Sequence, residues 1–229
     1  MIRAVLFDLD NTLTDFMRMK SASIAAAVDG MVDMGLKLPA DEARQRIFSI
    51  YEREGIEHQR VLDLFLKEVY GRVPPELLAA GIVHYRRARD SSLVTYPHVG
   101  LTLMELLRRG LRLAVLSDAP ALQAWQRLHQ LGLQHLFKPV ITFDDTGERK
   151  PSPKPFLHAL AQLGLPGEEV LMVGDWPERD MIGAQRVGMP TAFARYGDTF
   201  GTVESGADFD LDDILELLPI LDRLNGTTR

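Results

Sequence analysis

The sequence predicts an α/β fold, in which a parallel sheet forms a core and a helical segment is inserted into it. Short apolar runs recur along the chain, and their length suits strands that are buried on both faces of a sheet. These runs span residues 2–7, 111–116, 139–143, 170–173 and 191–194. Amphipathic segments that end at a glycine separate the later runs, and this alternation is typical of a parallel α/β sheet. Residues 16–92 break the alternation, and their sequence predicts helices without any strand.

The helices that should flank the sheet are marked by apolar residues three or four positions apart. Val99, Leu103 and Leu106 share one helical face, and Gly110 follows them. The same pattern recurs before Gly132, Gly164 and Gly188. Glycine just past the last turn fits the left-handed conformation that ends many helices.

The helical insert and the end of the chain complete the predicted organisation. Helices of the insert are expected over residues 17–34, 40–51, 60–70 and 75–89. We therefore expect a core formed by residues 1–15 and 93–229 and a helical domain formed by residues 16–92. Residues 211–224 are expected to form a last helix on the core, and residues 225–229 to fray.

Composition excludes several classes of function. The chain of 229 residues contains no cysteine, which excludes disulfides, thiolate zinc sites and cysteine nucleophiles. Its formal net charge of -6 argues against non-specific binding to nucleic acid, because a phosphate backbone needs a cationic surface. No apolar run is long enough to cross a membrane. We therefore expect a cytoplasmic protein that has neither nucleic acid nor a membrane as a partner. The oligomeric state that we expect is a monomer or a homodimer.

Polar residues stand at the ends of three predicted strands. Residues 8–12 read Asp-Leu-Asp-Asn-Thr after the first strand, Ser117 and Asp118 follow the second, and Asp175 follows the strand at 170–173. Because the carboxyl ends of parallel strands meet at one edge of a sheet, these residues are expected to form one site. Lys150, before the helix around residues 154–164, is expected to join them.

These residues carry a resemblance to a known family. The patterns Asp-x-Asp-x-Thr, Ser, Lys-Pro-x-Pro-x-x-Phe and Gly-Asp-x-x-x-x-Asp begin at residues 8, 117, 150 and 174. In this order they resemble the four motifs of the haloacid dehalogenase superfamily, and the resemblance covers roughly residues 1–15 and 96–200. It implies a Rossmann-like core with an all-helical cap of the C1 type.

The resemblance also implies a reaction. Members of this kind are Mg²⁺-dependent phosphatases that hydrolyse small organic phosphate monoesters through an aspartyl phosphate. Asp118, Gln123, Trp125 and the run Arg195-Tyr196-Gly197 resemble archaeal-type glyceraldehyde 3-phosphate and phosphoglycolate phosphatases more closely. The implied partner is a small phosphorylated metabolite of the triose phosphate, phosphoglycolate or sugar phosphate class.

The chemistry assigns a role to each polar residue near the reacting phosphorus. Asp8 is expected to attack phosphorus, and Asp10 to protonate the leaving alcohol and then deprotonate water. The hydroxyl of Ser117 and the backbone N–H groups of Asp118 and Ala119 are expected to bind the phosphoryl oxygens at a helix N-terminus. Ser117 or Asp118 could also simply cap that helix.

A cation and a lysine are expected to offset the charge of the phosphoryl group. Lys150 should neutralise it, with Lys154 as a rival only four residues away. Mg²⁺ is expected to bind the carboxylates of Asp8 and Asp175 and the backbone carbonyl of Asp10. Two further residues, Thr12 and Asp180, are expected to support this site without binding the metal directly, although Asp180 could instead cap the next helix.

The helical insert is expected to recognise the leaving group of the substrate. Glu57, His58 and Gln59 form a polar turn between two predicted helices, and their side chains could hydrogen-bond substrate oxygens. An ordinary exposed connection is the alternative. Trp125, at helical spacing, is expected in the core, whereas Trp176 could either line the site or pack outward.

Three rival functions remain at this point. A phosphomutase of the same superfamily would use the same four motifs and would form an isomer rather than free phosphate. A dehalogenase would need neither Mg²⁺ nor the acid Asp10. A phosphate sensor without catalysis should have lost Asp8 or Asp10, and both are present.

Overall fold

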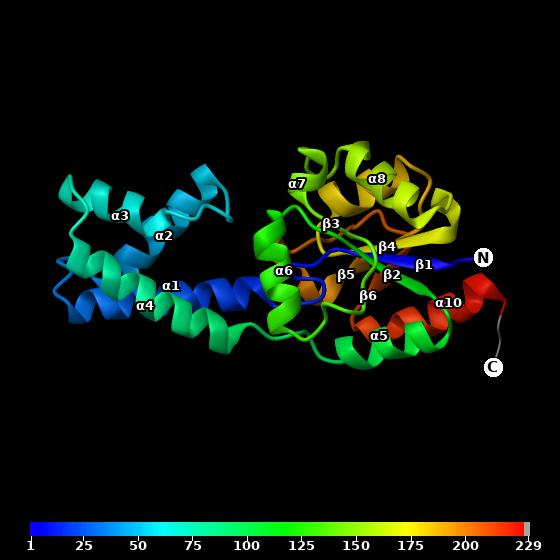
Figure 1. The fold of residues 1–229 in the computed structure, drawn as a ribbon, viewed down its shortest axis with the longest axis horizontal. Coiled ribbons are helices and arrows are strands. Elements are labelled where there is room, and N and C mark those ends of the chain that lie inside the picture. The colour runs from blue at the N-terminus through cyan, green and yellow to red at the C-terminus, as the bar shows by residue number, and fades with distance from the viewer. Residues whose placement is uncertain (227–229) are drawn as a thin grey trace. The chain divides into compact units, whose positions relative to one another are not determined.

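The computed structural model describes residues 1–226 and divides into two compact units (Figure 1). The first unit contains Met1–Asp15 and the chain from Val94 onward, and the second contains Phe16–Leu93. The first unit holds the whole sheet, whereas the second is built from helices.

The sheet has six parallel strands in the order β3-β2-β1-β4-β5-β6. Their bounds are Ala4–Phe7 (β1), Arg112–Leu116 (β2), Val140–Ile141 (β3), Val170–Gly174 (β4), Thr191–Ala194 (β5) and Phe209–Leu211 (β6). Strand β1 is central and pairs with β2 on one side and β4 on the other. The predicted α/β fold with a parallel sheet is confirmed.

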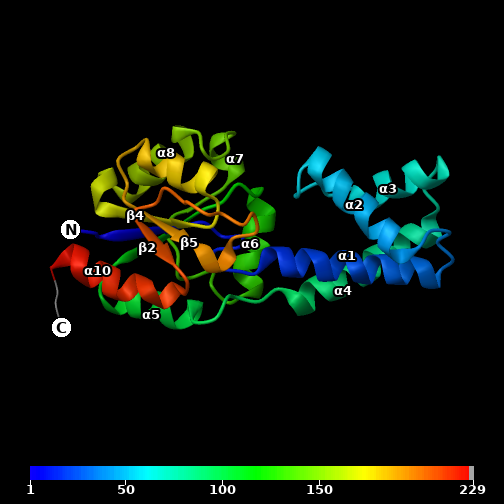
Figure 2. The same cartoon turned by 180° about the vertical axis from the view of Figure 1, so that it is seen from behind.

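Helices cover both faces of the sheet (Figures 1 and 2). Alternate residues of β1 point to opposite faces, so that Val5 and Phe7 belong to one apolar cluster and Ala4 and Leu6 to the other. The first cluster is completed by α5 (Val99–Arg108), α6 (Ala121–Gln130) and α10 (Leu217–Asn225). The second is completed by α8 (Pro153–Leu163) and α9 (Ile182–Gln185).

Two predicted segments of the first unit differ from the structure. The run at 139–143 forms a strand of only two residues, because Phe143 begins the short helix α7 (Phe143–Thr146), which Thr142 and Asp145 cap reciprocally. The segment 211–224 is not one helix: Leu211 ends β6, a 3₁₀ turn follows at Ile214–Glu216, and α10 begins at Leu217. Of residues 225–229, which were expected to fray, 227–229 lie outside the described part of the chain.

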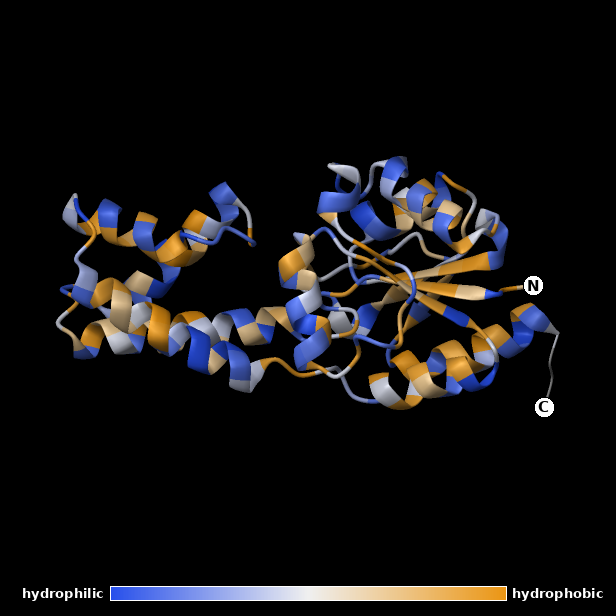
Figure 3. Ribbon diagram, viewed as in Figure 1, coloured by the Kyte–Doolittle hydropathy of each residue, from blue (hydrophilic) through white to orange (hydrophobic). Residues whose placement is uncertain are grey.

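The second unit consists of α1 (Phe16–Asp33), α2 (Ala40–Glu54), α3 (Val61–Tyr70) and α4 (Pro75–Ser92). Its helices are amphipathic, with hydrophilic and hydrophobic residues interspersed along each of them (Figure 3). They enclose an apolar core of their own, which includes Met31, Ile47 and Phe65. Helices α1 and α4 approach closely at Gly30, where a Cβ atom would lie 2.6 Å from the His84 ring. This unit therefore has a hydrophobic core of its own.

Candidate active site

The first site loop follows β1 and turns sharply. Asn11 has φ 59°, a left-handed conformation that asparagine tolerates better than most residues. Its N–H donates to the carbonyl of Thr14 over 2.8 Å, which closes the turn. The loop thus places Asp8 and Asp10 at the carboxyl end of the central strand.

Lys150 joins two of the predicted acidic residues. Its Nζ lies 2.5 Å from Asp8 Oδ1 and 2.6 Å from Asp180 Oδ1, and all three side chains are buried. The rival Lys154 is exposed and instead pairs with Glu148 over 3.3 Å. Burial opposes the charge of Lys150, but Asp180 and Asp8 outweigh it and hold the pKa of this lysine above its usual range. Lys150 is therefore a fixed positive charge beside Asp8.

Three buried carboxylates lie together at this edge of the sheet. Asp8, Asp175 and Asp180 each place one carboxylate oxygen within 4.8 Å of the others. Burial, with the charges of Asp8 and Asp180, raises the pKa of Asp175 well above its ordinary value. Burial also raises the pKa of Asp8, and it raises that of Asp180 to about 6 although Lys150 opposes the change. A single lysine does not fully offset three such groups, so the donor set fits a divalent cation with oxygen ligands.

Two of the three predicted metal ligands, Asp8 and Asp175, belong to this carboxylate cluster, whereas the carboxylate of Asp10 does not. Asp180 shares it with Asp8 and Asp175, and Thr12 Oγ1 donates to Asp175 Oδ1 over 3.2 Å. The carboxylate of Asp10 does not belong to the cluster, which agrees with a contribution from its backbone carbonyl alone. The metal-binding roles of Asp8, Asp10 and Asp175 stay predictions.

Arg127 is a site residue that the sequence motifs did not indicate. Its Nη1 donates to Asp10 Oδ2 over 2.6 Å, and its side chain is buried. Arg127 lies on α6 between Ala124 and Leu128, which face the apolar core. An arginine within an apolar helical stripe is the signal that could have identified it, because a buried guanidinium needs an anionic partner.

The predicted phosphate-binding segment lies in a turn before a helix. Ser117 is buried, and its Oγ accepts a hydrogen bond from the Ala119 N–H over 3.2 Å. We expected these residues at a helix N-terminus, but α6 begins only at Ala121, after Pro120. Proline at position 120 favours an extended preceding residue, so the helix starts later than expected.

Asp118 uses its side chain to hold other parts of the site in place. One carboxylate oxygen accepts from the backbone N–H of Lys150 over 3.0 Å, and the other pairs with Arg179 over 3.1 Å. The Arg179 guanidinium stacks 3.7 Å from the Trp176 ring centroid, which in turn lies 4.4 Å from that of Phe200. Trp176 is thus half-buried in a stack with these two residues.

The run Arg195-Tyr196-Gly197 supports the first loop. The Tyr196 hydroxyl donates to the carbonyl of Thr12 over 2.9 Å. Gly197 packs so tightly that a Cβ atom would lie 1.6 Å from the carbonyl oxygen of Asn11. This segment therefore holds the backbone of the loop that carries Asp8 and Asp10, the two aspartates that are predicted to be catalytic.

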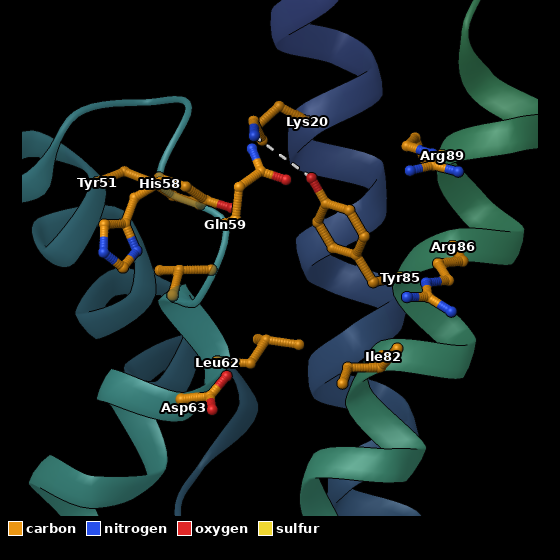
Figure 4. A pocket seen from close by; sticks show the side chains of 11 residues that line it. Lys20, Tyr51, His58, Gln59, Leu62, Asp63, Ile82, Tyr85, Arg86 and Arg89 are labelled. Carbon is orange, nitrogen blue, oxygen red and sulfur yellow. Dashed lines mark hydrogen bonds between the residues drawn. The ribbon is translucent and has the colours of Figure 1, made fainter. Parts of the chain in front are cut away.

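Two further predictions concern surface positions. Trp125 was expected in the core, but its side chain is 38% exposed on α6 and lies beside His129. Glu57, His58 and Gln59 form the turn between α2 and α3 of the helical unit, and His58 and Gln59 line a pocket there (Figure 4). The expected contact of this turn with a leaving group stays a prediction.

Comparison with known proteins identifies the family. A model of the haloacid dehalogenase-like hydrolases matches residues 2–188. The chain belongs to this family. It is 33% identical to a glyceraldehyde 3-phosphate phosphatase of Methanopyrus kandleri, over 98% of this chain and 99% of the relative. A phosphoglycolate phosphatase of Salmonella typhi is 30% identical, with 96% and 92% covered.

Solved structures agree with this membership. A phosphatase of the family from Thermococcus onnurineus is 29% identical, has a TM-score of 0.70, and is matched over 96% of this chain and 98% of that one. The predicted family, fold and enzyme class, a phosphoric monoester hydrolase, are therefore confirmed. Among residues 1–226, none of the helices is both long and apolar enough to cross a membrane.

Proposed function

We propose that the protein is a Mg²⁺-dependent phosphatase that hydrolyses a small organic phosphate monoester through an aspartyl phosphate on Asp8. The observation that carries this proposal is the buried cluster of Asp8, Lys150, Asp175 and Asp180 at the end of the central strand. It combines a nucleophile, a fixed positive charge and oxygen ligands for a cation, the parts that phosphoryl transfer needs. Mg²⁺ held by Asp8, Asp175 and the Asp10 carbonyl would offset negative charge on the phosphoryl oxygens.

The two steps of the reaction use Asp8 and Asp10 in turn. A carboxylate oxygen of Asp8 attacks phosphorus, the bond between phosphorus and the ester oxygen breaks, and Asp10 gives a proton to the leaving alcohol. Asp10 then takes a proton from water as the water oxygen attacks the phosphorus of the aspartyl phosphate, which frees Asp8. The Nζ of Lys150 lies 2.5 Å from Asp8 Oδ1. Its positive charge favours the ionised form of Asp8, although burial of this carboxylate opposes ionisation.

The phosphoryl group is held by the residues around Ser117. We infer that the Ser117 hydroxyl and the N–H groups of Asp118 and Ala119 turn toward the phosphoryl oxygens. Ala119 donates to Ser117 in the described state, so this bond has to be exchanged for one to the substrate. Thr12 and Asp180 keep Asp175 and Lys150 in place, as their contacts suggest.

We infer the substrate class from the relatives. The two relatives above are named for glyceraldehyde 3-phosphate and phosphoglycolate, both small phosphate esters. The substrate is thus proposed to be a triose phosphate, phosphoglycolate or a sugar phosphate. The helical unit, Phe16–Leu93, is proposed to act as a cap that excludes water and reads the leaving group, with Glu57, His58 and Gln59 in contact with it. A cytoplasmic location, a monomer or homodimer, and the absence of nucleic-acid and membrane partners stay predictions.

The proposal is tested by a panel of phosphate esters assayed with Mg²⁺ and with EDTA. We expect release of inorganic phosphate only with Mg²⁺, and a gain of one phosphoryl group on Asp8 in rapidly quenched enzyme. Asp8→Asn should lower kcat by about a thousandfold, or roughly 4 kcal/mol of barrier. The control Asp212→Asn changes an exposed aspartate of the same unit and should leave kcat unchanged. Full activity in EDTA, or an isomerised ester in place of free phosphate, would contradict the proposal.

A further inference from the structure

The helical unit contains a pocket of its own, with a volume of about 190 Å³ (Figure 4). It is lined from α1, α2, α3, α4 and the turn between α2 and α3. The residues that matter here are Lys20, Tyr51, His58, Gln59, Tyr85 and Arg86. All belong to the same unit, so the shape of the pocket does not depend on where the first unit lies.

Lys20 is a buried ammonium group in this pocket that lacks an anionic partner. Its side chain is 5% exposed, and its Nζ donates to the Tyr85 hydroxyl over 3.3 Å. The same Nζ lies 4.5 Å from the centroid of the Tyr51 ring and 5.3 Å from that of Phe16. Among the described residues, no carboxylate forms an ion pair with Lys20. An ammonium group has three protons to donate, and a buried charge without an anion is costly.

The other charges of the pocket do not supply the missing anion. Asp63 lines it but pairs with Arg60 over 2.9 Å. Arg89 pairs with Asp90 over 2.8 Å, whereas Arg86 forms no ion pair with any residue of the described chain. The negative charge of Glu57 contributes to the raised pKa of Tyr51, but Glu57 does not line the pocket. Lys20 and Arg86 therefore leave the pocket with uncompensated positive charge.

The uncharged polar groups add further hydrogen-bond donors to the pocket. His58 Nδ1 accepts from the Arg60 N–H over 3.2 Å, so the proton of the neutral ring is on Nε2, where it can be donated. Burial and the neighbouring Tyr85 raise the pKa of Tyr51, which keeps its phenol neutral. Gln59 uses one amide proton on the carbonyl of Glu57 over 2.6 Å and keeps the other.

We propose that this pocket binds the carboxylate group of a small organic anion, with Lys20 as its main partner. A carboxylate carries one negative charge and accepts several hydrogen bonds, which matches one buried ammonium surrounded by neutral donors. A phosphate dianion would need a second cation at the same depth, but Arg86 is exposed.

The carboxylate could come from two sources. It could be part of the substrate, in which case this inference rests on the proposed phosphatase function. It could also belong to a separate metabolite that regulates the enzyme. Binding and kinetic measurements separate these sources, and binding alone tests the site without any catalysis.

Binding is measured by NMR titration of the full-length ¹⁵N-labelled protein with sodium glycolate, at constant ionic strength. We expect the amide signals of Lys20, Tyr51 and Tyr85 to shift, and ethylene glycol to leave them unchanged. Lys20→Met should weaken glycolate binding at least tenfold, which corresponds to about 1.4 kcal/mol. The matched control Lys67→Met removes an exposed lysine of α3 outside the pocket and should bind as the native protein does.

Kinetics with two matched esters then identify the source. If the substrate brings the carboxylate, Lys20→Met lowers kcat/KM at least tenfold for 2-phosphoglycolate and less than twofold for 2-hydroxyethyl phosphate, which lacks the carboxylate. In this case glycolate competes with 2-phosphoglycolate. If a separate metabolite brings it, Lys20→Met changes neither ester by itself, and glycolate alters both rates without competing. Either pattern, together with the binding result, supports the site.

Two results overturn the inference. One is equal glycolate affinity of the native protein and Lys20→Met, and the other is the absence of shifts at the pocket in the native protein. The second result needs no variant, so it holds even if Lys20→Met does not fold. Failure of the phosphatase proposal looks different, because no ester is then hydrolysed while glycolate still shifts the pocket signals.

Discussion

The guanidinium of Arg127 holds the carboxylate of Asp10, with 2.6 Å between Nη1 and Oδ2. The two residues are far apart in sequence, and α6 brings the buried arginine to the loop after β1. In the proposed mechanism Asp10 moves the protons, so a group that fixes its carboxyl also fixes the direction of proton transfer. Arg127 is a positioning residue in this sense, since it acts through Asp10.

Replacing Arg127 by methionine should therefore affect substrates unequally. An alkyl ester has a poor leaving group and depends on protonation, whereas an aryl phosphate leaves readily without it. For Arg127→Met we expect kcat to fall at least tenfold with an alkyl phosphate and less than about threefold with p-nitrophenyl phosphate. Steady-state assays of both esters measure the difference.

The control for this experiment is Arg108→Met. Arg108 is an exposed arginine of the same unit that pairs with Glu105 on the surface of α5, so its loss should change neither ester. Equal losses with both esters in Arg127→Met would show that the arginine acts on the phosphoryl group and not through Asp10.

The crowded carboxylates predict how stability depends on pH and on metal. Without a cation, the folded protein holds the pKa of Asp180 at about 6, compared with 3.8 for the ordinary group, and the pKa of Asp175 is also raised. The folded state therefore binds more protons than the unfolded state in this window. Proton binding by these carboxylates should therefore add to the free energy of unfolding. This stabilisation should be fully present below pH 3.8 and should be lost as the pH rises through about 6.

A divalent cation should restore this stability at neutral pH. We expect Mg²⁺ at one hundred times its Kd to add about 2.7 kcal/mol to the free energy of unfolding. Ca²⁺ should stabilise the protein as well but support little turnover, because it takes more ligands in a looser geometry. Urea unfolding of metal-stripped protein at pH 5 and pH 7.5, with and without each cation, measures these effects. Asp175→Asn should remove most of the response, and a full response in that variant would place the cation elsewhere.

Much of the fold was predictable because its strands are short and almost wholly apolar. β1, β2 and β4 are buried along nearly their whole length, and each is followed directly by a polar residue that the proposed reaction uses. Strand β6 was not predictable in this way, since Phe209–Leu211 has three residues and an exposed Asp210 at its centre. Its residues pair with the edge of β5, a tertiary contact that the sequence pattern does not reveal.

The partners of the site residues were less predictable than the residues themselves. Motif spacing indicated Asp8, Lys150 and Asp175 as candidates, but it could not show that Asp118 binds the Lys150 backbone or that Arg127 reaches Asp10. Those contacts join segments that are far apart in the sequence, and they depend on the tertiary structure that brings these segments together. The exposure of Trp125 has the same origin, because helical spacing alone does not show which face of α6 is covered.

The turn between α2 and α3 gives a prediction about specificity. His58→Ala should lower kcat/KM for the physiological ester at least tenfold, about 1.4 kcal/mol, and should change an aryl phosphate much less. Because His58 also accepts from the Arg60 N–H, the turn itself needs a control. His58→Asn keeps an acceptor near that N–H but removes the donor at Nε2, so it should share the loss. Equal and small effects on both esters would mean that the turn is only a connection.

The last prediction concerns the contact between Gly197 and the loop after β1. In Gly197→Ala the new Cβ would lie 1.6 Å from the Asn11 carbonyl oxygen and 3.4 Å from Asp175 Cβ. Both neighbours belong to the site, so either the loop after β1 or the turn at Arg195–Gly197 has to move. We expect Gly197→Ala to lose about 1–3 kcal/mol of stability. We also expect kcat to fall by up to about a hundredfold, because displacements near 1 Å are enough to disrupt in-line attack.

Gly100→Ala is the matched control for this substitution. Gly100 lies in α5, and its added Cβ meets no atom within 4 Å. Alanine within a helix is favoured over glycine, so this variant should be as stable as the native protein or up to about 1 kcal/mol more stable. Thermal unfolding and kcat of both variants, measured in the same buffer with Mg²⁺, make the comparison. If Gly197→Ala keeps native kcat while Gly100→Ala behaves as expected, the turn at Arg195–Gly197 does not position the aspartates, and its tight packing serves stability alone.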